Sequence, residues 1–262
     1  MLINLSFLPL LPKWFSYIPA RPNKALFGLV MSGETDIERA FCQALVKDIQ
    51  SSTQSHPILC LLYHVVECDE MGYFFTVPMA PEALDSWGIR NQDGTQFTTE
   101  DVVSFCQGLV SLNRKNHTMV LRSPLLKDHL RNDVFGIEYH ARQATASLRY
   151  ISKLDFVRGA CNSSQELKQR FQAHPYLWFA AQSHLFKFLP PSFESDFFTF
   201  AASPGSIESY LQARDAGPFF DDETYDECER YTRRWKRYTR GATALGLAVT
   251  LGNEAIVRGF IA

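Results

Sequence analysis

The stretch at residues 241–262 carries the pattern that most restricts what this chain can fold into. Its small and apolar residues recur at the spacing of two short antiparallel helices, at Gly241, Thr243, Leu245, Ala248, Gly252, Ile256 and Val257. Thr243 suits the start of the first helix, and Gly252 suits the turn between the two helices. Such a helix pair cannot bury its apolar face alone. The sequence therefore predicts a unit that must stack on a neighbour.

This spacing matches the ankyrin repeat, with Ala244 where that repeat usually has Pro and Gly246 where it usually has His. We expect its open edge to face a missing neighbour and to bind a protein partner. The residues of that edge are Val249, Ile256, Phe260 and Ile261. Upstream, Ala201 and Gly205 repeat part of the spacing. They indicate either a divergent capping unit or two ordinary helices.

The first half of the chain predicts helices followed by a small hairpin. One helix is expected at 24–31 and a second one from Thr35 or Asp36, whose apolar face is Ile37, Phe41, Leu45 and Ile49. The apolar run at 56–67 fits either a buried helix or a strand.

Residues 97–133 give the clearest local prediction. Thr98 or Thr99 can cap a helix, and the short runs "LVSL" and "TMVL" predict two strands of a hairpin. Ser123 and Pro124 then begin another helix. Helix, two-stranded wing and helix form the outline of a winged-helix domain.

A helical connector is expected next. The helix at 137–154 has one apolar stripe, formed by Ile137, Ala141, Ala144, Leu148 and Ile151. Residues 162–174 begin with a capping box at Ser163. Residues 175–189 predict a helix that is apolar on most sides and therefore buried.

These segments, in this order, resemble the part of fungal NACHT–ankyrin proteins, which are STAND/NLR-like, that follows the nucleotide-binding domain. The resemblance rests on "SLRYI", "CNSSQELKQRF", "HPYLWFAAQSH" and the winged-helix outline before them, and it covers residues 24–262. It implies a mostly α-helical fold: a degenerate winged helix with a small β-wing, a helical connector and C-terminal ankyrin-type helix pairs. The implied domains are a tail at 1–22, then 23–135, 136–190 and 191–262.

The same resemblance implies a role in non-self recognition and programmed cell death, but the family's ATPase motif is missing. No G-x-x-x-x-G-K-[ST] sequence is present. We therefore expect no nucleotide cofactor and no enzyme activity. The expected function is protein–protein interaction or scaffolding, with an ankyrin-containing or NACHT protein as one candidate partner. Two alternatives stay open: an accessory protein or cryptic enzyme of a fungal biosynthetic gene cluster, and a gene-model fragment without an independent role.

Charge gives little reason to expect nucleic acid or a membrane as partner. The net charge is −2. One interpretation of the basic run at 230–240 is that it binds an acidic partner through Arg233 and Arg237. The other is that its aromatic residues pack inward and its basic residues pair with the acidic run at 221–229. The helix expected at 99–108 carries Glu100 and Asp101 and no Lys or Arg, which argues against DNA binding.

Two groups of residues could carry chemistry. His56, Cys60, His64 and Cys68 are spaced by four, but on a helix their ends lie about 18 Å apart, too far for one tetrahedral ion. Cys161 with His174 or His184 is a formal nucleophile–base pair without a family signature around it. We expect no catalytic, cofactor-binding or metal site.

Two features bear on the compartment. Six scattered cysteines without a CxxC pair indicate reduced thiols and a cytoplasmic location. The apolar start, "MLINLSFLPLLPKWF", has no basic n-region and contains Pro9 and Pro12, so we interpret it as a tail that packs on the first domain or is disordered, not as a signal peptide.

Overall fold

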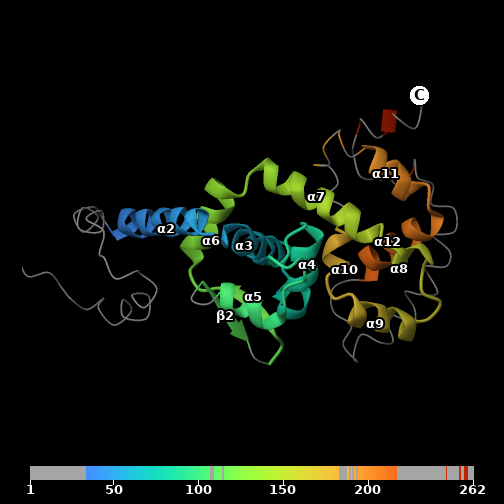
Figure 1. The fold of residues 1–262 in the computed structure, drawn as a ribbon, viewed down its shortest axis with the longest axis horizontal. Helices are drawn as coiled ribbons and strands as arrows, with labels where there is room; N and C mark the ends of the chain where they lie inside the picture. Colours follow the sequence, from blue (N-terminus) through green and yellow to red (C-terminus); the bar gives the residue numbers. More distant parts are fainter. Residues whose placement is uncertain are drawn as a thin grey trace, which may run out of the picture.

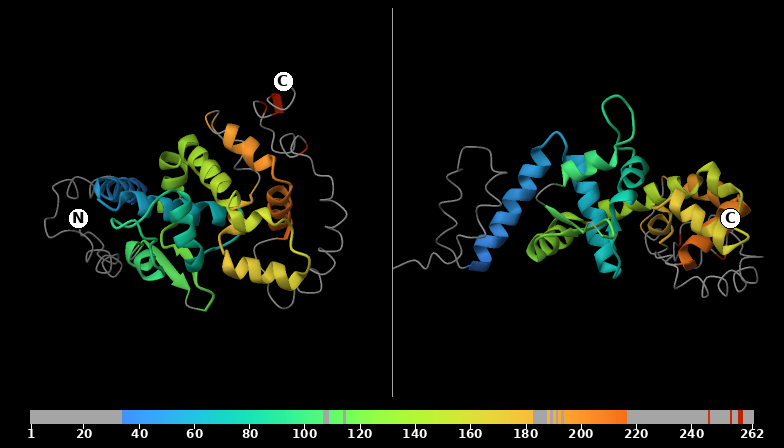
Figure 2. Two further views of the ribbon diagram at one scale, coloured as in Figure 1. Left: turned by 45° about the vertical axis from the view of Figure 1, so that its right-hand side comes forward. Right: turned by 90° about the horizontal axis from the view of Figure 1, so that it is seen from below.

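The computed structural model describes residues 34–106, 109–113, 115–182, 188, 190, 192, 194–216, 246, 254, 257 and 258. This part of the chain is mostly helical and contains a small three-stranded antiparallel sheet. The mostly α-helical prediction is therefore confirmed at this level. The helix α2 forms one end of the described structure, and α9, α11 and α12 lie at the other end (Figures 1 and 2).

Two helices begin the described chain, α2 (Glu34–Ser51) and α3 (Ser55–Glu70). The apolar run that the sequence left undecided is α3, which is buried on nearly every side. In α2 the buried residues are Cys42, Val46 and Ile49. The side chain of Ile37 lies outside the described residues. Ile49 is buried as predicted, whereas Phe41 and Leu45 are only partly buried and their neighbours Cys42 and Val46 are buried instead. Contacts with both α3 and α6 turn this face of α2 inward.

The sheet consists of β1 (Phe75–Thr76), β2 (Val110–Asn113) and β3 (Thr118–Leu121), with β3 between the other two. The predicted hairpin is confirmed: β2 and β3 pair antiparallel, with Val110 opposite Leu121 and Asn113 opposite Thr118. A 3₁₀ turn (Val77–Met79), α4 (Ala80–Ser86) and α5 (Thr99–Phe105) separate β1 from β2.

Side-chain caps fix where several helices begin. Thr98 accepts a hydrogen bond from the Asp101 backbone, and the Asp101 side chain accepts one in return, a complete capping box for α5. Ser123 caps α6 (Pro124–His129), which has Pro at its first position. The π-helical turn at Leu130–Val134 then leads into α7 (Ile137–Ile151).

In α7 the predicted apolar stripe holds only in part. Ala144, Leu148 and Ile151 are buried, whereas Ile137 is 70% exposed and Ala141 is partly exposed. The prediction is wrong for these two residues because the first turn of α7 packs on Tyr63 of α3 through Tyr139 and His140 instead.

The remaining elements are α8 (Leu154–Val157), α9 (Ser164–Ala173), α10 (Leu177–Ala180), α11 (Glu194–Ala201) and α12 (Pro204–Ala216). The Ser163 cap on α9 is confirmed by its hydrogen bond from the Glu166 backbone. The predicted helix at 175–189 is buried from Tyr176 to Ala181 and partly buried at Pro175, Gln182 and Phe188, but α10 has only four residues. One cluster of buried apolar side chains extends from Cys42 to Ala213, across the boundary expected at 135 and 136.

Several predictions lie outside the described residues. These are the tail at 1–22, the helix at 24–31, the basic run with Arg233 and Arg237, and the edge formed by Val249, Ile256, Phe260 and Ile261. Only four isolated positions of the ankyrin-like stretch are described.

Candidate interaction surface

The row of His and Cys on α3 is mostly buried. Cys60, His64 and Cys68 have no exposed surface, and only His56 is exposed. The Cys60 Sγ and the His64 Nδ1 are 3.7 Å apart, one helical turn from each other. Within the described ranges, no three His, Cys, Asp or Glu side chains form a group that could hold a metal ion.

Both ring nitrogens of His64 form hydrogen bonds with other residues of the chain. Its Nδ1 lies 2.7 Å from the Cys60 carbonyl oxygen, which can only accept, so Nδ1 carries the proton. Nε2 must then accept, and it lies 2.9 Å from the Tyr176 hydroxyl. Burial lowers the pKa of His64 to about 4, and the hydrogen bond to the Cys60 carbonyl only partly opposes this. The imidazole is therefore neutral in the folded protein at neutral pH.

Gln143 on α7 completes this network. Its Nε2 donates to the Tyr176 hydroxyl at 2.6 Å and to the Ser147 Oγ at 2.8 Å. Its Oε1 accepts from the Trp87 indole Nε1 at 2.7 Å. The network joins α3, α7 and the residues that end α4 and begin α10, and it fixes how α7 lies on α4.

Cys161 and His174, the formal nucleophile–base pair, each contact other residues instead. The Cys161 backbone N–H donates to the Gln212 Oε1 at 2.7 Å, and the Gln212 Nε2 donates back to the Cys161 carbonyl at 3.1 Å. His174 instead faces the Glu82 carboxylate, with Nδ1 and Oε1 3.5 Å apart. Burial raises the pKa of the Cys161 thiol, which disfavours the thiolate that nucleophilic catalysis needs. His184 lies outside the described residues.

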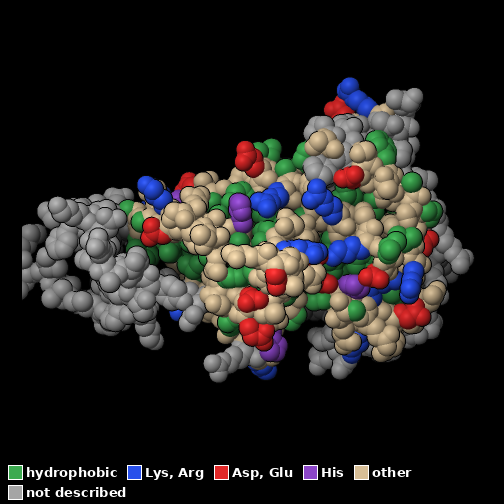
Figure 3. Space-filling model, in the orientation of Figure 1, with side chains coloured by type: hydrophobic (Ala, Val, Ile, Leu, Met, Phe, Trp, Pro, Cys, Tyr) green, Lys and Arg blue, Asp and Glu red, His purple; other side chains and the backbone are tan. Residues whose placement is uncertain are grey.

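Four cations lie exposed over α7 and α4. From Arg142 to Tyr150, Arg142 and Arg149 are the exposed residues of α7, and Lys153 follows two residues after its end. Arg90, just beyond α4, joins them. We name Arg90, Arg142, Arg149 and Lys153 the basic strip. Figure 3 shows Lys and Arg side chains gathered in the middle of this face, over α7 and α4.

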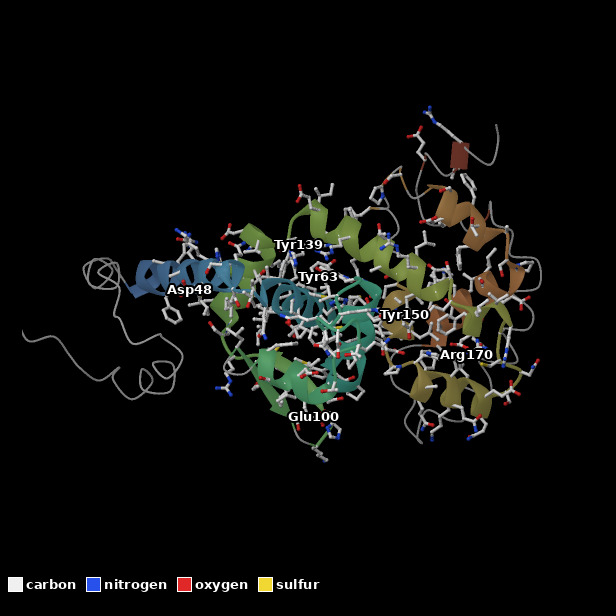
Figure 4. The ribbon with its side chains drawn as sticks, viewed as in Figure 1. Asp48, Tyr63, Glu100, Tyr139, Tyr150 and Arg170 are labelled. Atoms are coloured by element: carbon white, nitrogen blue, oxygen red, sulfur yellow. The ribbon has the colours of Figure 1, made fainter. Side chains whose placement is uncertain are left out.

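The protein holds three of these cations, Arg90, Arg142 and Lys153, in place. The Asp85 carboxylate, with its side chain only 9% exposed, binds Arg90 at 2.6 Å through one oxygen and lies 3.4 Å from the Lys153 Nζ through the other. The Arg142 guanidinium lies 4.7 Å from the ring centre of Trp87, and the Lys153 Nζ lies 4.6 Å from that of Tyr150. Tyr150 marks this end of α7 in Figure 4. Buried groups therefore set the position of exposed charges.

A groove of about 210 Å³ lies between α3, β3 and α6. Its lining includes the partly exposed side chains of Phe74 and Val120. An ion pair between Lys127 and Asp69 lies at the same place.

The basic strip was not predicted from the sequence. Its signal was the spacing of seven and four between Arg142, Arg149 and Lys153, which places them near one face of a helix. Arg90 had no such signal, because only the fold brings its partner Asp85 to Lys153.

Among the helices of the described part, none combines the length and the apolar character needed to cross a membrane. Comparisons with protein-family models, with curated proteins and with solved structures give no match to this chain.

Proposed function

We propose that this chain is a non-catalytic protein-interaction module that binds its partner through the face formed by α7 and α4. The observation that carries the proposal is the basic strip, in which Asp85, Trp87 and Tyr150 fix three of the four cations, Arg90, Arg142 and Lys153. Side chains held in one position lose less conformational freedom on binding, so they favour recognition.

The order of elements supports a degenerate winged helix as the first part of this module. Helix α3, strand β1, helices α4 and α5 and the β2–β3 hairpin follow one another as in a winged helix, and β3 lies between β1 and β2. In that comparison α5 takes the place of the helix that reads DNA. It carries Glu100, which is exposed, and Asp101, which is partly exposed, and both would repel phosphate. Glu100 lies on the outer side of α5 in Figure 4. This favours a protein partner over nucleic acid.

The state of the reactive side chains supports a non-catalytic role. Burial raises the pKa of the thiols of Cys60 and Cys68, and that of Cys106 to about 12. His64 is fully buried and hydrogen-bonded through both nitrogens. These groups hold the core together and have no path to a substrate.

The wider proposal, from the resemblance, is a scaffold similar to the C-terminal part of a fungal NACHT–ankyrin receptor and located in the cytoplasm. In it, Val249, Ile256, Phe260 and Ile261 bind an ankyrin-type unit of a partner or of a second copy. Sedimentation of the purified chain over a range of concentrations, with and without an ankyrin unit added in trans, tests this edge. A chain that stays monomeric and binds no added unit contradicts it.

The α7–α4 face is tested separately by photo-crosslinking. A photoreactive phenylalanine analogue replaces Ser152, which is exposed between Arg149 and Lys153, and in a matched control it replaces Gln169, which is exposed on α9. In an extract of the source cells we expect a discrete protein adduct from position 152 and not from position 169. No adduct, or equal adducts from both positions, contradicts the proposed function.

A further inference from the structure

The basic strip has the dimensions of a short extended peptide. Arg142 and Ile151, the last residue of α7, are nine residues apart, about 14 Å at the rise of a helix. Arg149 lies between them, and Lys153 lies two residues beyond. An extended chain rises about 3.3 Å per residue, so five or six residues span the strip. Among the described residues, Arg90 and Lys153 share one carboxylate, that of Asp85, so this pair keeps an excess of positive charge. We propose that the basic strip binds an extended acidic segment of the partner protein, an inference that rests on the proposed function.

The arrangement of the cations favours carboxylates as ligands. Because Arg142 lies over the ring of Trp87, the edge of its guanidinium is available to a carboxylate. Asp85 has only two carboxylate oxygens, and each already faces one cation. Arg90 and Lys153, whose side chains are 52% and 38% exposed, keep donors directed to solvent. Two donors held a fixed distance apart on one buried anchor suit a ligand with closely spaced acids.

The surroundings of the strip favour a protein segment over nucleic acid. Glu138 is exposed one turn before Arg142, and Asp155, whose side chain is 66% exposed, follows Lys153. A duplex lying along α7 would therefore meet a carboxylate at each end of the strip. The overall net charge of −2 adds no general attraction for polyanions. A short acidic segment can lie between Glu138 and Asp155 without meeting either.

The test uses the full chain and a short fluorescent peptide rich in Asp and Glu, with a second peptide that has Asn and Gln at the same positions. We expect the acidic peptide alone to bind, with an affinity that falls as salt rises from about 0.05 to 0.3 M. The double variant Arg142→Glu/Arg149→Glu should weaken binding at least about tenfold. The matched control, Lys47→Glu/Lys115→Glu, reverses two exposed charges elsewhere and should change it less than about threefold.

Several outcomes overturn the inference. These are equal binding of the uncharged peptide, wild-type affinity in the strip variant, and an equal loss in the control variant. Duplex DNA or heparin that binds more tightly than the peptide and displaces it would identify a general polyanion surface instead. If the double variant does not fold, Arg149→Gln alone serves, since Arg149 is exposed and outside the core; it should still weaken binding by about threefold or more.

Crosslinking at position 152 separates this inference from the function on which it rests. An adduct that disappears in the Arg142→Glu/Arg149→Glu background supports both. An adduct that persists there leaves the proposed function standing and overturns the acidic partner. The absence of any adduct in the wild-type background overturns the proposed function itself.

Discussion

The imidazole Nε2 of His64 lies 2.9 Å from the hydroxyl of Tyr176, a residue 112 positions further along the chain. Both side chains have no exposed surface. The ring of His64 also packs on Phe75 and Phe179, with ring centres 5.3 and 5.0 Å away. This contact joins the helix before the sheet to the helical region after it. Both regions therefore pack on α3.

Gln143 is the residue on which this network most depends. Gln143→Leu would leave the indole N–H of Trp87 without an acceptor and remove a donor to Tyr176. We expect the free energy of unfolding to fall by about 2–4 kcal/mol, because buried polar groups would lose their partners. Denaturant titration measures this change.

The matched control for this prediction is Gln169→Leu, at an exposed position of α9, where we expect a change within about 0.5 kcal/mol. Equal stability of the two variants would show that the network contributes nothing beyond packing.

The buried imidazole makes stability depend on pH. The folded-state pKa of His64 is lowered from 6.5 to about 4, so between these values the unfolded chain binds more protons. The contribution of His64 is therefore fully present above pH 6.5 and is lost as the pH falls through about 4. His64→Gln removes this titration. The advantage of the wild type over His64→Gln should shrink by about 3 kcal/mol between pH 7 and pH 4. A constant difference over that range would mean that His64 is not buried as neutral imidazole.

Glu67 makes the stability of the fold depend on pH in the opposite direction to His64, over an overlapping pH range. Burial, with the nearby Glu70, raises its pKa from 4.5 to about 7, so the folded state holds more protons than the unfolded state between these values. Its ionisation therefore destabilises the fold as the pH rises from 4.5 toward 7. Glu67→Gln should gain stability relative to the wild type as the pH rises through this range, measured by urea titration at several pH values. A relative stability that is flat or falls with pH would contradict the raised pKa.

Local features of the fold were predictable because they depend on neighbours in the sequence. The caps at Thr98, Ser123 and Ser163 each need only a side chain and a backbone N–H three residues later. The β2–β3 hairpin needs only two short β-like runs and a polar turn. The exposure of Ile137 was not predictable, since it depends on which side of the first turn of α7 meets α3.

The candidate site was harder to predict, because its residues meet only in the folded chain. Asp85 and Lys153 are 68 positions apart, and Trp87 and Gln143 are 56 apart. The spacing of Arg142 and Arg149 was visible in the sequence, but an exposed face of a helix gives the same spacing without any function. Only the contacts with Asp85, Trp87 and Tyr150 distinguish a fixed set of cations from an ordinary solvated face.

The buried thiols give a prediction about reactivity. Cys60, Cys68 and Cys106 have no exposed surface and pKa values raised by burial, so almost none of each is thiolate at pH 8. We expect no modification of these three by iodoacetamide in the native protein and complete modification after unfolding in guanidinium. Mass spectrometry of the peptides identifies each site. Rapid labelling of Cys60 in the native protein would show that α3 is not the centre of the core.

Gly205 marks the closest approach of two backbones in the second half of the molecule. A Cβ on Gly205 would lie 1.9 Å from the Val157 carbonyl oxygen, where α12 passes the end of α8. This approach lets the Ser209 hydroxyl reach the Phe156 and Gly159 carbonyl oxygens, at 2.6 and 2.8 Å. Gly205→Ala must push α12 away and weaken both contacts. We expect a loss of about 2–3 kcal/mol in the free energy of unfolding.

The control for Gly205 is Gly136→Ala, because an added Cβ there meets nothing within 4 Å and the backbone φ is −84°. We expect it to cost less than about 1 kcal/mol, the value of a modest change at a helix start. Thermal and denaturant unfolding of both variants make the comparison. Similar stabilities would mean that α12 shifts freely along α8. A large loss at Gly205 alone would show that glycine at this position serves the packing of two helices, whether or not it also belongs to a repeat pattern.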